Sequence, residues 1–68
     1  MTTSDRDIQA TALIVFQQHG RSSSYYARGR AETLRDEGAH TGAETWERSA
    51  ALCEEWESEE RKAGEGVN

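Results

Sequence analysis

The sequence predicts an all-α protein, a small antiparallel three-helix bundle with a disordered carboxyl-terminal tail. Three observations support this. Glycines at Gly20 and across Gly38–Gly42 divide the 68 residues into three segments, each segment spaces its apolar residues three and four apart, and the chain contains no proline. Because that spacing places side chains on one face of a helix, we expect helices near residues 4–19, 23–37 and 42–61. They would form a single domain of residues 4–62, followed by a flexible tail at 63–68.

The first segment combines an amino-terminal cap with an apolar stripe. Ser4 followed by Asp7 is typical of a capping box, in which the serine oxygen accepts a hydrogen bond from an unpaired backbone amide. Leu13 and Ile14 are expected to widen the apolar face. Gly20 suits the left-handed conformation that ends many helices. The core stripe itself consists of Ile8, Ala12, Val15 and Phe16.

The second segment begins at three serines, Ser22–Ser24, any of which can cap a helix. Ala27, Ala31 and Leu34 then keep helical spacing. Gly29 lies among them and lowers helix propensity by about 1 kcal/mol relative to alanine. Its presence beside two alanines predicts a surface that another helix approaches closely.

The third segment matches the capping box more fully, with Thr41 as the cap and Glu44 three residues later. Glu44 with Arg48 and Glu57 with Arg61 have the i,i+4 spacing that favours ion pairs on one helix. The apolar stripe consists of Trp46, Ser49, Ala50, Cys53 and Trp56, with Leu52 beside it.

Charge is distributed unevenly along the chain. The formal net charge is -5, which argues against general nucleic-acid binding because that binding requires neutralised phosphates. Residues 21–35 are nevertheless basic and residues 44–62 acidic. We expect Arg28 and Arg30 to pair with glutamates of the third segment. The alternative is contact with a nucleic acid or another anion, for which the candidates are Arg21, Tyr25, Arg28 and Arg30.

The third segment also carries the candidates for binding a protein partner. Trp56 lies in a charged neighbourhood, where a tryptophan can either anchor a partner or complete the core, whereas Trp46 is expected in the core. The glutamates around Trp56 can either mimic a phosphate backbone for a basic partner or form a solvated face. The candidate partner-binding residues are Trp56, Glu54, Glu55, Glu57, Glu59 and Glu60.

Length and composition argue against an enzyme. A core of this size supplies only about 3–5 kcal/mol of net stability, so self-association or partner binding is a natural supplement. The residues suited to nucleophilic or metal chemistry are His19, His40 and Cys53, and they form no motif. We therefore expect no catalytic residue, no metal and no cofactor. No apolar run approaches the roughly 20 residues that span a membrane, and a single cysteine suits a reducing, cytoplasmic location.

Several short motifs resemble those of short, uncharacterised alphaproteobacterial proteins. His19-Gly20 follows the first helix, the run from Tyr26 to Leu34 reads Tyr-Ala-Arg-Gly-Arg-Ala-Glu-Thr-Leu, and Gly42-Ala43-Glu44-Thr45-Trp46 comes after a glycine turn. The resemblance covers residues 8–56. It implies a helical fold and a soluble location and transfers no catalytic role. The sequence departs from the pattern after Trp46, where Cys53-Glu54-Glu55-Trp56 replaces an aliphatic run.

The sequence therefore favours a non-catalytic adaptor or regulator that presents a helical surface to another protein or to a second copy of itself. One alternative is an acidic, phage-type inhibitor, such as an anti-CRISPR protein, that blocks a basic nucleic-acid-binding partner. The other is weak nucleic-acid binding through the basic second helix.

Overall fold

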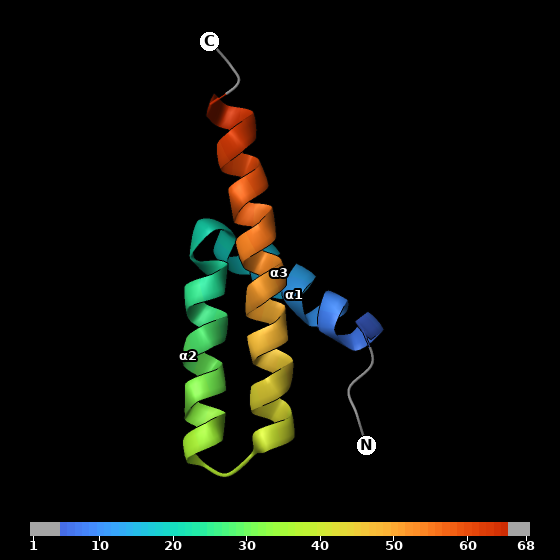
Figure 1. Ribbon diagram of the computed structural model, residues 1–68, viewed down its shortest axis with the longest axis vertical. Helices are drawn as coiled ribbons and strands as arrows, with labels where there is room; N and C mark the ends of the chain where they lie inside the picture. Colours follow the sequence, from blue (N-terminus) through green and yellow to red (C-terminus); the bar gives the residue numbers. More distant parts are fainter. Residues whose placement is uncertain (1–4, 66–68) are drawn as a thin grey trace.

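The computed structural model describes residues 5–65, and almost all of them are helical (Figure 1). The elements are α1 (Asp5–His19), the 3₁₀ turn η1 (Gly20–Ser22), α2 (Ser23–Asp36) and α3 (His40–Glu65). No strand occurs among these residues, so the predicted all-α class is confirmed. The bounds of α1 and α2 agree with the sequence prediction to within one residue.

Helices α2 and α3 lie side by side in opposite directions, and α1 crosses α3 at an angle (Figure 1). Arg28 pairs with Glu54 and Arg35 pairs with Glu47, so residue numbers rise along α2 as they fall along α3. The antiparallel arrangement expected from the sequence therefore holds for α2 and α3, whereas α1 departs from it.

The buried face of α1 is the predicted stripe without its predicted widening. Ile8, Ala12 and Val15 are buried and Phe16 is half-buried, as predicted. Leu13 and Ile14 do not widen this face, because 50% and 54% of their surfaces remain exposed. The predicted cap residue Ser4 lies outside the described residues.

The turn between α1 and α2 depends on one glycine in the left-handed region. Gly20 has a φ of 56° and directly follows the last residue of α1, as predicted. The 3₁₀ turn that begins there keeps residues 5–36 continuously helical while changing the direction of the chain. Ser22 precedes α2, but its side chain makes no capping hydrogen bond.

Helix α2 buries Ala27 and Ala31 and leaves Gly29 in the open. A Cβ added at Gly29 would meet no atom within 4 Å, so the predicted close approach of a helix to this glycine is wrong. The close approach occurs instead at Gly42, where an added Cβ would lie 3.3 Å from Leu34 Cδ1. Alanine spacing located the face that α3 covers, but Gly29 lies off that face.

The α2–α3 turn is a Schellman motif. Ala39 N donates to Leu34 O at 2.8 Å and Gly38 N donates to Arg35 O at 3.0 Å, with Gly38 at a φ of 85°. Ala43 N then donates to Ala39 O at 2.9 Å, so α3 already begins at His40. The predicted capping box from Thr41 is therefore wrong, because Thr41 lies inside the first turn.

Helix α1 packs on α3 through small side chains. Ser49 Oγ lies 3.4 Å from Ile8 O and Cys53 Sγ lies 3.6 Å from Ala12 O, both at hydrogen-bonding distance. Serine and cysteine at these positions let the backbone of α1 come close to α3. From the first contact to the second, the residue number rises by four in both helices. The chain therefore runs in roughly the same direction along α1 as along α3.

The core that results is made of small residues. Among the described residues, five of the eight buried hydrophobic side chains are alanines. Larger side chains pack around Ala12, Val15 and Cys53 but stay partly accessible, namely Phe16, Trp46, Leu52 and Trp56. Because hydrophobic stabilisation scales with buried apolar area, such a core stabilises the fold only modestly.

The carboxyl-terminal part of α3 extends past the other two helices (Figure 1). The helix continues to Glu65, three residues into the predicted flexible tail of residues 63–68. Residues 66–68 lie outside the described residues. None of the described helices is both long enough and apolar enough to cross a membrane.

Candidate interaction surfaces

Two glutamates of the predicted acidic partner-binding run make contacts within the molecule. Glu54 forms an ion pair with Arg28 across the α2–α3 interface. Glu57 Oε2 accepts hydrogen bonds from Ser23 Oγ at 3.1 Å and from Ser24 N at 3.0 Å. The remaining members, Glu55, Glu59 and Glu60, are exposed.

Glu57 acts as a cap for α2 although it belongs to α3. The first backbone amides of a helix have no partner within the helix, and the positive end of the helix dipole favours an anion there. Glu57 satisfies both needs at the start of α2. The serines signalled correctly where a cap was needed. The sequence did not reveal that a carboxylate 33 residues away would supply it.

Trp56 packs within the molecule. Its ring meets Phe16 edge to face, with the centroids 5.5 Å apart and an interplanar angle of 81°. It is half-buried against the Ala12, Val15 and Cys53 cluster. Trp56 therefore joins the end of α1 to α3, which is the structural alternative that the sequence left open.

The predicted anion-contact residues are divided among different contacts. Arg28 is paired with Glu54, and the Arg30 guanidinium carbon lies 5.8 Å from the centroid of the Trp46 ring. The expected pairing with a third-segment glutamate therefore holds for Arg28, whereas Arg30 stacks on an aromatic ring. Arg21 and Tyr25 are exposed, and 84% of the Tyr25 surface is accessible.

A row of rings connects the end of α1 with α2 and α3. His19 stacks on Tyr26 with centroids 4.1 Å apart, and Tyr26 meets Trp46 edge to face at 6.0 Å. Tyr26 keeps 40% of its surface exposed. These contacts secure the Gly20 turn from outside the core, a role for His19 that its position at a helix end did not predict.

Cys53 is buried completely, and its surroundings do not activate it as a nucleophile. Burial raises the pKa of the Cys53 thiol, a hydrogen bond with Ser23 lowers that pKa in part, and the Glu57 carboxylate raises it further. Reactive cysteines have a lowered pKa and some exposure. Among the described residues there is also no group of three or more metal-binding side chains.

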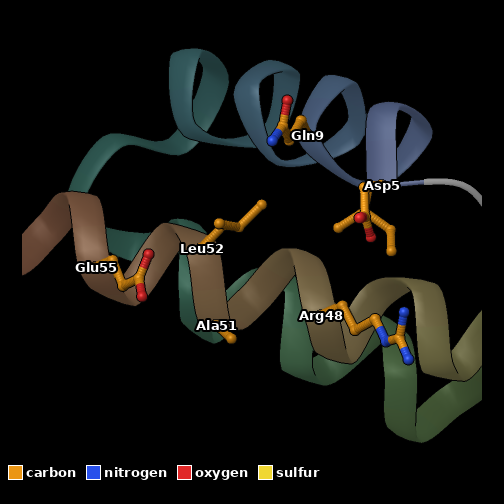
Figure 2. A pocket seen from close by; sticks show the side chains of 7 residues that line it. Asp5, Gln9, Arg48, Ala51, Leu52 and Glu55 are labelled. Carbon is orange, nitrogen blue, oxygen red and sulfur yellow. The ribbon is translucent and has the colours of Figure 1, made fainter.

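A shallow groove of about 320 Å³ lies between α1 and α3 (Figure 2). Its apolar lining comes from Ile8, Ala51 and Leu52, and Leu52 points from α3 toward α1 in this view. The remaining lining residues are polar or charged: Asp5, Gln9, Arg48 and Glu55. Arg48 also pairs with Glu44 at 3.1 Å, the i,i+4 contact expected from the sequence.

The outer side of α1 adjoins this groove and is apolar in its centre. Leu13 lies one helical turn beyond Gln9, which lines the groove, and Ile14 follows it. Both are about half exposed. No charged residue occurs from Gln9 to Gln18, in a protein whose residues are 31% charged. This is the surface that sequence reasoning missed, because it placed both residues in the core.

Comparison of the chain with protein-family models, with curated proteins and with solved structures found no match. The resemblance to short alphaproteobacterial proteins accordingly stays a prediction.

Proposed function

We propose that residues 4–62 act as a single three-helix, non-catalytic module, an adaptor or regulator that binds protein through a helical surface. A cytoplasmic location is expected on the sequence grounds given above. The supporting observation is the exposed pair Leu13 and Ile14 on α1, of which Leu13 lies one helical turn beyond Gln9 at the edge of the α1–α3 groove.

This surface suits a protein partner better than a small molecule. Ligand pockets enclose most of a small molecule, whereas the groove is shallow and open to solvent. Large apolar side chains on an uncharged helix face are the features that partner helices bury on association. The charged residues at the groove edge, Asp5, Arg48 and Glu55, would then lie at the rim of the contact.

The test is to remove the two apolar side chains and measure protein binding. Purified wild type and a Leu13→Gln/Ile14→Gln double variant are immobilised and exposed to a lysate of the source organism. Tyr25→Gln is the matched control, because it removes an exposed apolar side chain from α2. We expect a protein captured equally by wild type and control and at least about tenfold less by the double variant. Equal capture by all three, with circular dichroism showing intact helices, would reject this surface.

A second candidate function is supported by the free end of α3. Glu59 and Glu60 are exposed there, Glu55 is exposed about one turn earlier at the edge of the α1–α3 groove, and Figure 1 shows that the end of α3 extends beyond the other helices. An acidic projection of this kind fits a basic groove that normally holds nucleic acid. The candidate is an acidic phage-type inhibitor of a nucleic-acid-binding protein.

Two variants that lose the same number of negative charges at different places separate the effect of the α3 glutamates from the effect of net charge. Glu55→Gln/Glu59→Gln/Glu60→Gln removes three charges from α3, and Glu32→Gln/Asp36→Asn/Glu37→Gln removes three exposed charges from α2 and the residue that follows it. An inhibitor would lose binding to a basic partner only in the first variant, and wild-type binding would weaken steeply with salt. Binding that is indifferent to salt would exclude this candidate.

Nucleic-acid binding through Arg21, Tyr25, Arg28 and Arg30 has the least support. Arg28 already neutralises Glu54, and Arg30 lies over Trp46. Phosphate binding would have to compete with both contacts in a chain of net charge -5. If the protein shifts neither single- nor double-stranded DNA or RNA in a gel at low salt, nucleic-acid binding is excluded as its function.

A further inference from the structure

We infer that an exposed side of α2 carries a second interaction surface, a groove that binds an acidic segment of a partner protein through Arg30. This α2 groove has a volume of about 460 Å³ and includes residues on both sides of Gly20. Most of its lining residues are three and four positions apart and therefore share one side of the helix. They are Ser22, Tyr25, Tyr26, Gly29, Arg30 and Thr33, with His19 of α1 beside them.

The lining of the α2 groove contains no carboxylate although the protein is acidic. Aspartate and glutamate outnumber lysine and arginine by 13 to 8, yet the lining contains one arginine and no acidic residue. The α1–α3 groove, by contrast, includes Asp5 and Glu55. An anionic group of a partner would therefore be attracted to the α2 groove and repelled by part of the α1–α3 groove.

Arg30 is positioned by a contact that uses none of its hydrogen-bond donors. Among the described residues it forms no ion pair, whereas Arg28, Arg35 and Arg48 each have a glutamate partner. Its guanidinium carbon lies 5.8 Å from the centroid of the Trp46 ring. Contact with the face of an aromatic ring leaves the N–H groups of a guanidinium available. Arg30 can therefore bind a carboxylate with two parallel hydrogen bonds.

The two tyrosines supply the apolar part of the α2 groove. Tyr25 and Tyr26 are both exposed, and His19 stacks on Tyr26 and holds that ring in position. Tyrosine and arginine dominate the binding energy of many protein interfaces, since both combine a broad flat surface with polar groups. The α2 groove therefore suits a segment that has an apolar side chain near its carboxylate.

Gly29 lines the α2 groove, and the fold itself gives no reason for a glycine there. A glycine inside a helix is about 1 kcal/mol less favourable than alanine. Alanine would fit at this position, because an added Cβ would meet no atom within 4 Å. A partner segment supplies the reason, since the absence of a Cβ lets it approach the backbone of α2 closely.

The single arginine of the α2 groove favours a protein segment over a nucleic acid. A nucleic-acid backbone is bound by neutralising several phosphates, and Arg28 would have to leave Glu54 in order to contribute. One carboxylate needs only Arg30, in the position that it already occupies over Trp46. Binding of a nucleic acid in this groove would therefore contradict the inference.

The α2 groove shares no residue with Leu13, Ile14 or the α1–α3 groove, so this inference is independent of the surface proposed above. The capture test distinguishes the two. A protein bound in the α2 groove would be lost from Tyr25→Gln and retained by Leu13→Gln/Ile14→Gln, the reverse of the result expected for the surface on α1.

The first experiment selects ligands from random peptides displayed on phage, with the purified full chain immobilised as the target. The enriched peptides should contain more aspartate and glutamate than the unselected library. One of them, synthesised with a dye, should bind wild type in fluorescence anisotropy, and Arg30→Gln should weaken this binding at least about tenfold. Arg61→Gln is the matched control, because it removes the same charge from an exposed position of α3. Circular dichroism verifies that both variants fold.

Two results of this experiment would overturn the inference. One is a selection that enriches no acidic peptides. The other is equal binding of the synthetic peptide by Arg30→Gln and Arg61→Gln. Displacement of the peptide by a single-stranded oligonucleotide would also overturn it, in favour of a nucleic-acid site.

The second experiment separates binding from stability with Gly29→Ala. Alanine should raise the free energy of unfolding because of its higher helix propensity. Its methyl group would nevertheless occupy the space through which the segment approaches the backbone. The same peptide should therefore bind at least about threefold more weakly to a more stable protein. A stabilised Gly29→Ala variant that binds the peptide as tightly as wild type would overturn the inference.

Discussion

At the scale of single residues, two glycines show that space and backbone angle decide the effect of a side chain. Gly29 lies in the middle of α2 with open space around it, whereas Gly38 has a φ of 85° in the α2–α3 turn. Alanine at Gly29 should stabilise the protein by about 0.5–1 kcal/mol, since helical alanine loses less backbone entropy on folding. Alanine at Gly38 should destabilise it by about 1–2 kcal/mol, because a Cβ is strained at positive φ. Urea unfolding of both variants measures the two free energies, and effects of the same sign would contradict this description of α2.

Cys53 provides a pH-dependent prediction at the same scale. Its pKa is raised in the folded state mainly by burial. Above about pH 8.5, a thiol in the unfolded chain releases its proton while the folded chain retains it. Stability contributed by the protonated thiol is therefore complete below that pH and declines as the pH rises toward the folded-state pKa.

The Cys53→Ala variant lacks this titration. The difference in unfolding free energy between wild type and Cys53→Ala should therefore shrink from pH 7 to pH 10, as measured by urea unfolding at each pH. Comparing the two proteins cancels the titration of tyrosines and lysine that they share. A constant difference would mean that Cys53 ionises as easily in the folded protein as in the unfolded chain.

At the scale of elements, the boundary between α1 and α2 is secured by a residue of α3. Glu57 caps α2 by accepting hydrogen bonds from Ser23 Oγ and Ser24 N. Glu57→Gln keeps the shape of the side chain but removes the charge, and it should lower stability by about 1 kcal/mol because charge-assisted hydrogen bonds are the stronger ones. Glu60→Gln, at an exposed position of the same helix, should change stability by less than about 0.5 kcal/mol. Chemical denaturation of the two variants tests the cap, and equal effects would refute it.

Local patterns in the sequence predicted where the helices begin and end better than they predicted which faces come into contact. Gly20 and Gly38 mark real helix ends because both adopt a positive φ, which glycine tolerates without strain. Thr41 misled the prediction, since the Schellman turn makes Ala39 the first acceptor of α3 and leaves Thr41 inside the helix. Leu13 and Ile14 misled it because an apolar run of five residues is wider than the strip of α1 that α3 covers. Which strip is covered depends on the small residues Ser49 and Cys53, far away in sequence.

At the scale of the whole molecule, the alternation of charge along the chain becomes contact between helices. The basic second segment lies against the acidic third, and pairs such as Arg28 with Glu54 use part of both charge excesses. These pairs are exposed and contribute about 0–1 kcal/mol each. They therefore favour the antiparallel direction of α2 and α3 more than they stabilise the fold. Exposed glutamates remain on the free end of α3, and the uncharged surface lies on α1.

The central claim is that α1 buries one face against α3 and keeps Leu13 and Ile14 available for a partner. Methyl NMR with a soluble paramagnetic agent tests this most directly. In dilute solution the methyl signals of Leu13 and Ile14, half exposed, should broaden strongly, while those of Ile8 and Val15, 5% and 3% exposed, should not. Equal protection of all four residues in dilute solution would contradict the account.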